Sequence, residues 1–137
     1  MFSQIKTSKA NKQLVTELTN KLNLGAENVI ARVAFAYSIE NSEKLSLLDM
    51  KDSQGKEYSR NVLFGDLSTF YIALVCLKYE IYKTDKDIPK YVKLHIDDGL
   101  ELIANEVKSN PNLTGFDFLI EKIEQGLSKI VESSKQD

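Results

Sequence analysis

The side chains best suited to chemistry lie in one short segment. The only histidine, His95, precedes the adjacent carboxylates Asp97 and Asp98. An imidazole and two carboxylates can join a metal site, but residues two apart on a helix point in different directions. The spacing therefore indicates a capping or solvated cluster, and we predict neither a metal site nor a catalytic site here.

Other nucleophile and phosphate motifs are incomplete. The only cysteine, Cys76, lies in a very apolar segment, which is typical of a packed core thiol. Gly55-Lys56 resembles the end of a P-loop, but that motif needs glycine where Met50 stands and Ser or Thr where Glu57 stands. No serine lies in a G-x-S-x-G elbow. We therefore expect no enzyme activity and no cofactor.

The basic residues are unevenly distributed. Residues 1–39 carry five basic and two acidic side chains, a net charge of +3, although the whole chain has a net charge of −2. A basic end on an acidic chain can bind an anionic partner. A solvated, lysine-rich helix is the alternative interpretation.

Composition indicates one soluble folding unit over residues 1–137. Apolar residues make up 42% of the chain and charged residues 28%, as in ordinary globular proteins. The N-terminus lacks the apolar segment of a signal peptide. The longest uncharged apolar run, residues 67–77, is shorter than the roughly 20 residues that span a bilayer. We expect a cytoplasmic protein without membrane association.

The periodicity predicts a mainly α fold of about five helices with a short N-terminal strand. Residues 2–7 alternate like a strand, and Ser8 can then cap a helix over residues 9–22. A second helix over residues 26–39 is apolar around much of its circumference, which indicates burial against a partner subunit. Residues 1–39 thus form a strand-helix-helix unit, followed by an irregular stretch over residues 40–65.

Residues 66–131 are predicted as the helical core. A helix over residues 66–82, starting at Asp66, is the most apolar and is predicted to be central. A further helix follows over residues 90–108. Thr114 and Asp117 resemble a capping box that opens the last helix, and residues 132–137 are predicted to be a frayed tail.

The opening order of strand, helix, glycine turn and apolar helix is compatible with a ribbon-helix-helix module. In that module, strands from two chains pair and enter a DNA groove. An ordinary strand followed by two helices is the alternative. Phe2, Gln4 and Lys6 share a strand face, so a ribbon in a groove would expose an aromatic ring.

Five segments, in their order along the chain, resemble the DndE family. They are FSQIKTS at residues 2–8, NVIARVAFAYSI at 28–39, DSQGKEY at 52–58, LFG at 63–65 and HIDDGL at 95–100. The resemblance covers residues 2–127. It implies a non-catalytic subunit of the machinery that replaces a non-bridging phosphate oxygen of DNA with sulfur. It also implies binding of duplex or nicked DNA through surface lysines, assembly into homotetramers, and partner subunits that supply the desulfurase, iron–sulfur and nucleotide-hydrolysing activities.

The resemblance assigns DNA contact to basic side chains that would neutralise phosphates rather than read bases. The assigned residues are Lys6, Lys9, Lys12 and Lys21, with Lys56 and Arg60 as weaker candidates. The N-terminus of the first helix should add unpaired N–H groups for a phosphate. Arg32, among apolar neighbours, is expected to pair with an acidic group. Two other functions stay open, a ribbon-helix-helix transcription regulator and a protein-interaction scaffold without DNA contact.

Overall fold

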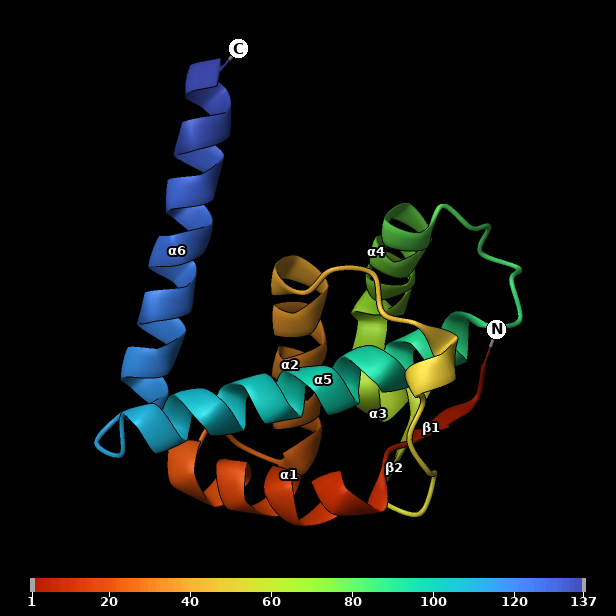
Figure 1. The fold of residues 1–137 in the computed structure, drawn as a ribbon, viewed down its shortest axis with the longest axis horizontal. Coiled ribbons are helices and arrows are strands. Elements are labelled where there is room, and N and C mark those ends of the chain that lie inside the picture. The colour runs from red at the N-terminus through yellow and green to blue at the C-terminus, as the bar shows by residue number, and fades with distance from the viewer. Residues whose placement is uncertain (1, 137) are drawn as a thin grey trace.

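A computed structural model describes residues 2–136, with side chains as far as Ser134. Helix α5 (Ile88–Ser109) runs through the middle of the molecule, and α1 (Lys9–Leu22) lies alongside it (Figure 1). Helices α2 (Glu27–Asn41) and α4 (Ser68–Tyr79) cross α5, and α6 (Gly115–Gln136) projects from its C-terminal end. The prediction of about five helices is confirmed by these five and the short α3 (Arg60–Phe64).

The central helix is α5, not the segment over residues 66–82 that the sequence indicated. Apolar residues at helical spacing, including Ile88, Val92 and Ile96, give α5 a continuous buried face. By contrast, α4 buries only Ile72 and Val75. Its apolar composition is typical of a buried helix, but Phe70 and Leu77 are 57% and 77% exposed.

The apolar helix 26–39 corresponds to α2, and it finds its cover within the chain. Ile30, Ala34 and Phe35 are fully buried. The α2 and α5 backbones touch at Gly99, where a Cβ atom would lie 1.9 Å from the carbonyl oxygen of Ala34. Burial of α2 therefore needs no partner subunit.

The segment before α4 is broken into short elements. Strand β2 (Glu57–Ser59) leads into α3, and the Ser59 hydroxyl accepts a hydrogen bond from the Val62 N–H at 3.2 Å. Gly65, at φ +56°, then ends α3, and the 3₁₀ turn η2 (Gly65–Leu67) leads into α4. A second 3₁₀ turn, η1 (Leu47–Asp49), lies in the irregular stretch 40–65. The predicted single helix over residues 66–82 is thus shorter, and its start is a turn.

One stretch of the described residues, Arg60–Tyr79, is long and apolar enough to cross a membrane, by length and composition only. Only 22% of its apolar window is buried. The turn at η2 interrupts it, and α4 alone has 12 residues where a spanning helix needs about 20. We interpret it as an exposed apolar surface.

The N-terminal strand pairs within its own chain. Strand β1 (Gln4–Lys6) runs antiparallel to β2, and the opposed Ile5 and Tyr58 are both buried. The Thr7 N–H extends the ladder by donating to the Lys56 carbonyl at 2.9 Å. Because β1 is paired to β2 and α2 is covered by α5, the chain forms the second alternative, an ordinary strand followed by two helices, and not the ribbon-helix-helix module.

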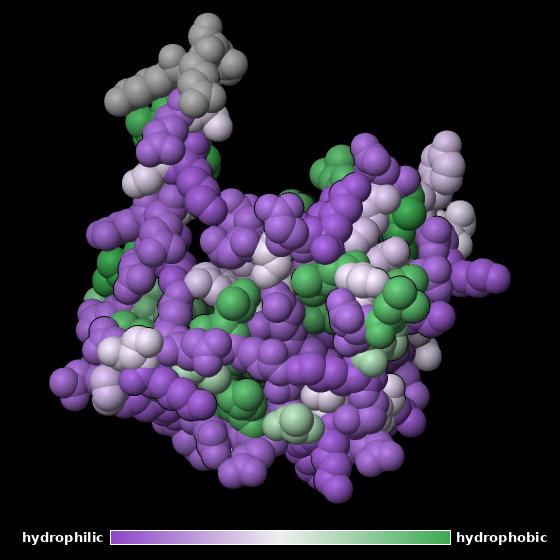
Figure 2. Space-filling view, viewed as in Figure 1, coloured by the Kyte–Doolittle hydropathy of each residue, from purple (hydrophilic) through white to green (hydrophobic). Residues whose placement is uncertain are grey.

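The last helix begins as predicted but runs further. The Thr114 hydroxyl accepts the Asp117 N–H at 3.1 Å, which is the predicted N-terminal cap. Helix α6 then continues to Gln136, so residues 132–136, expected as a frayed tail, are helical, while Asp137 lies outside the described residues. Figure 2 shows α6 standing clear of the body, with apolar atoms along it.

Candidate nucleic-acid interface

Three predicted contact residues lie together where β1 passes into α1. On β1, Ile5 points into the core, so Lys6 points outward. On α1, Val15 and Leu18 face the core, and Lys9 and Lys12 in the first turn are exposed. Within the described part of the chain, no ion pair involves these three ammonium groups.

The backbone of this junction is already occupied by carboxylates. Asp52 Oδ1 accepts the N–H of Lys9 at 2.9 Å, and Asp97 Oδ1 accepts the N–H of Ser8 at 3.2 Å. Hydrogen bonds from the Lys9 and Gln54 amides lower the pKa of Asp52. The predicted phosphate site on free N–H groups is therefore wrong at these amides, and an anion would be held by lysine side chains.

The other predicted contact residues are differently placed. Lys56 adjoins the junction, but its ammonium lies 3.3 Å from Glu27 Oε2. Lys21 lies about 18 Å from Lys9 along α1 and donates to the Pro111 carbonyl. Arg60 is half-buried, and its Nε is buried without a hydrogen-bond partner among residues 2–136. The structure thus groups Lys6, Lys9, Lys12 and Lys56, and separates Lys21.

Arg32 does not pair with an acidic group, contrary to the expectation. Its Nε donates to the Leu63 carbonyl at 2.6 Å, and its guanidinium also reaches the Val62 carbonyl at 3.3 Å. These carbonyls lie in the last turn of α3, where a cation is favoured by the helix dipole. Arg32 therefore holds α3 against α2.

Acidic side chains offset part of the positive charge of the group formed by Lys6, Lys9, Lys12 and Lys56. Lys6 stands opposite Glu57 in the β-ladder, and both side chains are exposed on the same face. With Glu27 beside Lys56 and Asp52 beside the start of α1, the positive potential of this end is modest.

Lys93, a buried lysine that the sequence did not single out, holds the junction together. It is 5% exposed, and its ammonium donates to the carbonyls of Lys6 at 3.0 Å and of Asp52 at 2.5 Å. The same nitrogen lies 3.7 Å from Asp97. The spacing of Lys93 and Asp97, four apart on a helix, was the one signal in the sequence.

His95 is not solvated, contrary to the expectation, but fully buried. Its Nδ1 lies 2.7 Å from the Ser38 hydroxyl, which donates to Asp98 at 2.6 Å, and its Nε2 lies 2.7 Å from the Tyr79 hydroxyl. Since Ser38 gives its only proton to Asp98, Nδ1 must be the protonated ring nitrogen. The network joins α2, α4 and α5.

The electrostatics of this network suit a structural role. Burial, with a contribution from Lys78, lowers the pKa of His95 to about 4 against the opposing effect of Asp98. The imidazole is therefore neutral at neutral pH. Ser38 is itself fully buried and lies between the imidazole and the carboxylate, so its hydroxyl is not presented as a nucleophile.

Cys76 is less buried than expected. It is half-buried at the edge of the core, not enclosed within it. Among the described residues, no group of three or more histidine, cysteine, aspartate or glutamate side chains is arranged to hold a metal ion.

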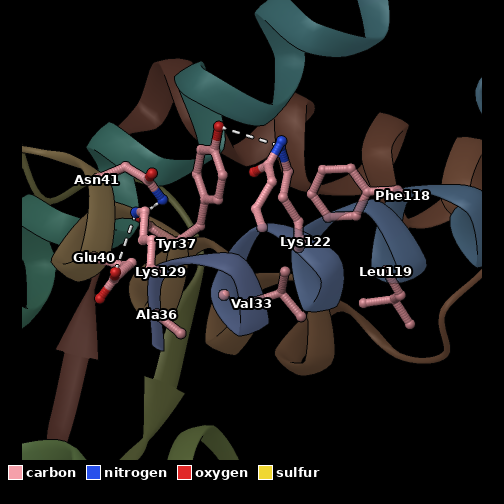
Figure 3. Close-up of a pocket in the computed structure, with 11 residues that line it drawn as sticks. Val33, Ala36, Tyr37, Glu40, Asn41, Phe118, Leu119, Lys122 and Lys129 are labelled. Atoms are coloured by element: carbon pink, nitrogen blue, oxygen red, sulfur yellow. Dashed lines mark hydrogen bonds and ion pairs between the residues drawn. The ribbon is translucent and has the colours of Figure 1, made fainter. Parts of the chain in front are cut away.

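A groove of about 250 Å³ separates α2 from α6 (Figure 3). At its edge, the Tyr37 hydroxyl donates to Glu106 at 2.5 Å, and Lys122 donates to the same carboxylate at 2.7 Å. Burial and then Glu106 raise the pKa of Tyr37. Burial disfavours the charged form of Lys122 and so lowers its pKa. The hydrogen bonds and charges of Glu106 and Tyr37 have the larger combined effect, so the pKa of Lys122 is raised. These groups satisfy one another and fasten the base of α6 to the body.

The fold and this surface define a small helical protein with an intrachain ribbon and a lysine-bearing junction. The chain belongs to the DndE family, because the family model described as DNA sulphur modification protein DndE matches residues 4–111. The prediction of that family is confirmed.

Solved structures agree with this assignment. The fold is similar to that of DndE from Escherichia coli B7A, described as involved in DNA phosphorothioation modification, with 17% identity and a TM-score of 0.61. It is also similar to a DndE G21/24K mutant, with 20% identity and a TM-score of 0.63. Each match covers 75% of this chain and 98% of the other. No curated protein sequence matches the chain.

Proposed function

We propose that this chain is a non-catalytic, cytoplasmic subunit of a DNA phosphorothioation system that binds intact or nicked duplex DNA through backbone phosphates. The observation that carries the proposal is the exposed group Lys6, Lys9 and Lys12 at the β1–α1 junction of a DndE-family fold. Lys56 contributes when DNA competes with Glu27 for its ammonium. Binding is weak and independent of sequence, because phosphate contacts carry no base information.

The junction is suited to this role because it is held rigidly from below. Lys93 binds the carbonyls at the end of β1 and in the 52–55 turn, while Asp52 and Asp97 bind the amides at the start of α1. The lysine backbones are therefore fixed, and only their side chains adapt to phosphates.

Assembly multiplies these weak contacts. The surface of α3 and α4 leaves Val62, Leu67, Phe70 and Leu77 between 51% and 77% exposed. Apolar surface of this kind marks an interaction site. We place a homo-oligomer contact there, with a homotetramer as the assembly, so that several lysine groups act on one duplex. Partner subunits of the sulfur-modification complex supply the chemistry.

The test is fluorescence anisotropy with intact and nicked duplexes at low salt. Lys6→Ala, Lys9→Ala and Lys12→Ala, combined, should nearly abolish binding without changing the oligomer. A matched control, Lys44→Ala, Lys83→Ala and Lys108→Ala, removes the same charge from scattered exposed positions and should bind like wild type. These three positions are preferable to Lys135 in the tail, whose side chain lies outside the described residues.

Two outcomes would contradict the proposal. Wild-type binding by the junction variant would place the DNA site elsewhere. Absence of binding by both the wild type and the control at low salt would favour the scaffold function.

A further inference from the structure

Helix α6 carries an apolar stripe that no other element among residues 2–136 covers. The stripe comprises Phe116, Ile120, Ile123, Leu127 and Ile130, which are between 38% and 71% exposed. Leu119 and Val131 widen it and are 37% and 51% exposed. The opposite side of the helix, with Phe118 buried and Lys122 and Lys129 paired to Glu106 and Glu40, faces the body. The stripe thus points away from the molecule, where a second chain can reach it.

The helix lies outside the part of the chain that defines the family. The family match ends at residue 111, and α6 begins at Gly115. The matched structures are covered almost completely by 75% of this chain. The stripe therefore lies outside the fold that the family shares. The function of that shared fold does not explain what the stripe packs against.

The spacing of the stripe is that of a coiled coil. Its five main residues follow one another at intervals of four, three, four and three. This is the alternation of a and d positions in a heptad repeat, with Ile120 and Leu127 at a and the others at d.

The residues at these positions favour more than two identical strands. Isoleucine at both a and d, as at Ile120 and Ile123, or leucine at a with isoleucine at d, as at Leu127 and Ile130, shifts parallel coiled coils from dimers towards trimers and tetramers. Leu119 at g and Val131 at e extend the apolar surface sideways, which a bundle of three or four helices can bury.

The charges beside the stripe favour a parallel arrangement of copies. One flank carries Asp117 and Glu124 at e positions, whereas the g positions are Leu119, Gly126 and Ser133. In a parallel bundle, the e row of one helix meets the g row of the next, so the carboxylates face uncharged residues. An antiparallel pair centred on the stripe would instead bring Glu124 against Glu124 of the second copy. A lipid surface is a poor match, because membrane-surface helices carry lysine and arginine on the polar face.

We propose that α6 is a self-association element, and that its stripe packs against α6 of further copies of this chain in a parallel bundle of three or four helices. The bundle is separate from the contact placed on α3 and α4. At its base, the bundle holds the remaining parts of the copies side by side. There, the Tyr37–Glu106–Lys122 cluster fixes the direction of α6 in each copy.

The test measures the mass of the full chain in solution by light scattering. Ile123→Glu with Leu127→Glu should reduce the number of copies by a factor of about two or more, because buried like charges would line the bundle. The control, Asn112→Glu with Ser128→Glu, adds the same charge at exposed positions off the stripe and should keep the wild-type mass. Both sites of the test variant are exposed in the single chain, so the body should keep its melting temperature.

A cysteine variant tests the direction of the helices. In a Cys76→Ala background, Ile130→Cys should form a disulfide between copies under mild oxidation, because a parallel bundle brings equal positions together. Ser128→Cys, on another side of the helix, should not. Wild-type mass in the double glutamate variant, or failure of Ile130→Cys to cross-link, overturns the proposal. If the double glutamate variant keeps the wild-type mass, the copies assemble through the α3–α4 surface alone. That result contradicts the role of α6 but not the proposed function.

Discussion

The ammonium of Lys93 lies 3.7 Å from the carboxylate of Asp97, one turn further along α5, and both side chains are almost fully buried. The pair sits beneath the β1–α1 junction, where Asp97 also accepts the amide of Ser8 and the side-chain amide of Asn11 at 2.7 Å. Every charge of the pair thus has several partners, which offset the cost of removing it from water.

Loss of Lys93 should be strongly destabilising. Lys93→Met keeps the bulk of the side chain but leaves Asp97 buried and without its cation, which costs about 3–5 kcal/mol in comparable sites. The measurement is urea unfolding at neutral pH. Lys90→Met, which removes an exposed partner of Asp87, should cost less than about 1 kcal/mol. Equal effects of the two changes would show that the buried pair has no special role.

The stability should fall between pH 6.5 and pH 4 because of His95. Its pKa is about 4 in the fold and 6.5 as an ordinary value, so the unfolded chain takes up the proton first. The stabilisation is therefore complete above pH 6.5 and is lost as the pH falls towards 4. A shift of this size corresponds to about 3 kcal/mol.

Urea unfolding as a function of pH measures this effect. His95→Gln should flatten the profile in that window, although it lowers stability at neutral pH. The Lys9 and Gln54 amides lower the pKa of the Asp52 carboxyl, so its own contribution to stability is lost mainly at still lower pH. A wild-type profile that stays level down to pH 4 would refute the role of His95.

Two glycines inside helices, Gly99 in α5 and Gly126 in α6, should respond oppositely to alanine. At Gly99, a Cβ atom would lie 1.9 Å from the backbone oxygen of Ala34, so α2 and α5 must separate, at a cost of about 2–3 kcal/mol or more. At Gly126, nothing lies within 4 Å, and alanine should stabilise α6 by about 0.5–1 kcal/mol. Thermal unfolding of both variants checks the contrast, and a harmless Gly99→Ala would mean that the helices are not so close.

The helix positions were predictable because local signals mark them. Ser8, Pro89 and Thr114 lie at the starts of α1, α5 and α6, and the apolar periodicity sets the helix faces. Burial was harder to predict than position. Helix α4 is more apolar than α5, yet α5 is central, because burial depends on which helices cross and not on composition alone.

The candidate site was only partly predictable for a similar reason. Lys6, Lys9 and Lys12 are close in sequence, and the structure keeps them close. Glu57, which faces Lys6 in the ladder, and Asp52, which accepts the Lys9 amide, come from a distant segment of the chain. No local sequence pattern could therefore indicate these contacts. Likewise, the sequence around His95 indicated a solvated residue because Ser38 and Tyr79 reach it only in the folded chain.

Cys76 should be dispensable for DNA sulfur modification. The half-buried thiol has no place in the His95 network or at the lysine junction. Cys76→Ala should leave modification in cells intact, measured by cleavage or mass spectrometry of the DNA. Loss of modification by a normally folded Cys76→Ala protein would refute the proposal that this subunit is non-catalytic.

Neutralising Glu57 should strengthen DNA binding. Glu57 faces Lys6 across the ladder, so its charge both offsets that of the lysine and repels phosphates. One unit charge at about 4 Å is worth about 1 kcal/mol in water, so Glu57→Gln should tighten binding about fivefold at low salt. Salt should erase the gain as screening grows, with little difference left near 1 M.

Anisotropy across a salt series tests this prediction together with the lysine site. Glu43→Gln, which removes an exposed carboxylate elsewhere, is the matched control and should bind like wild type. In the junction variant without Lys6, Lys9 and Lys12, the change at Glu57 should bring little gain, because the lysine that it opposes is gone. The log–log salt slope should fall by about 0.9 for each phosphate that the protein no longer neutralises. Equal gains from Glu57→Gln and Glu43→Gln would mean that only net charge matters, and that the β1–α1 junction is not the place where DNA binds.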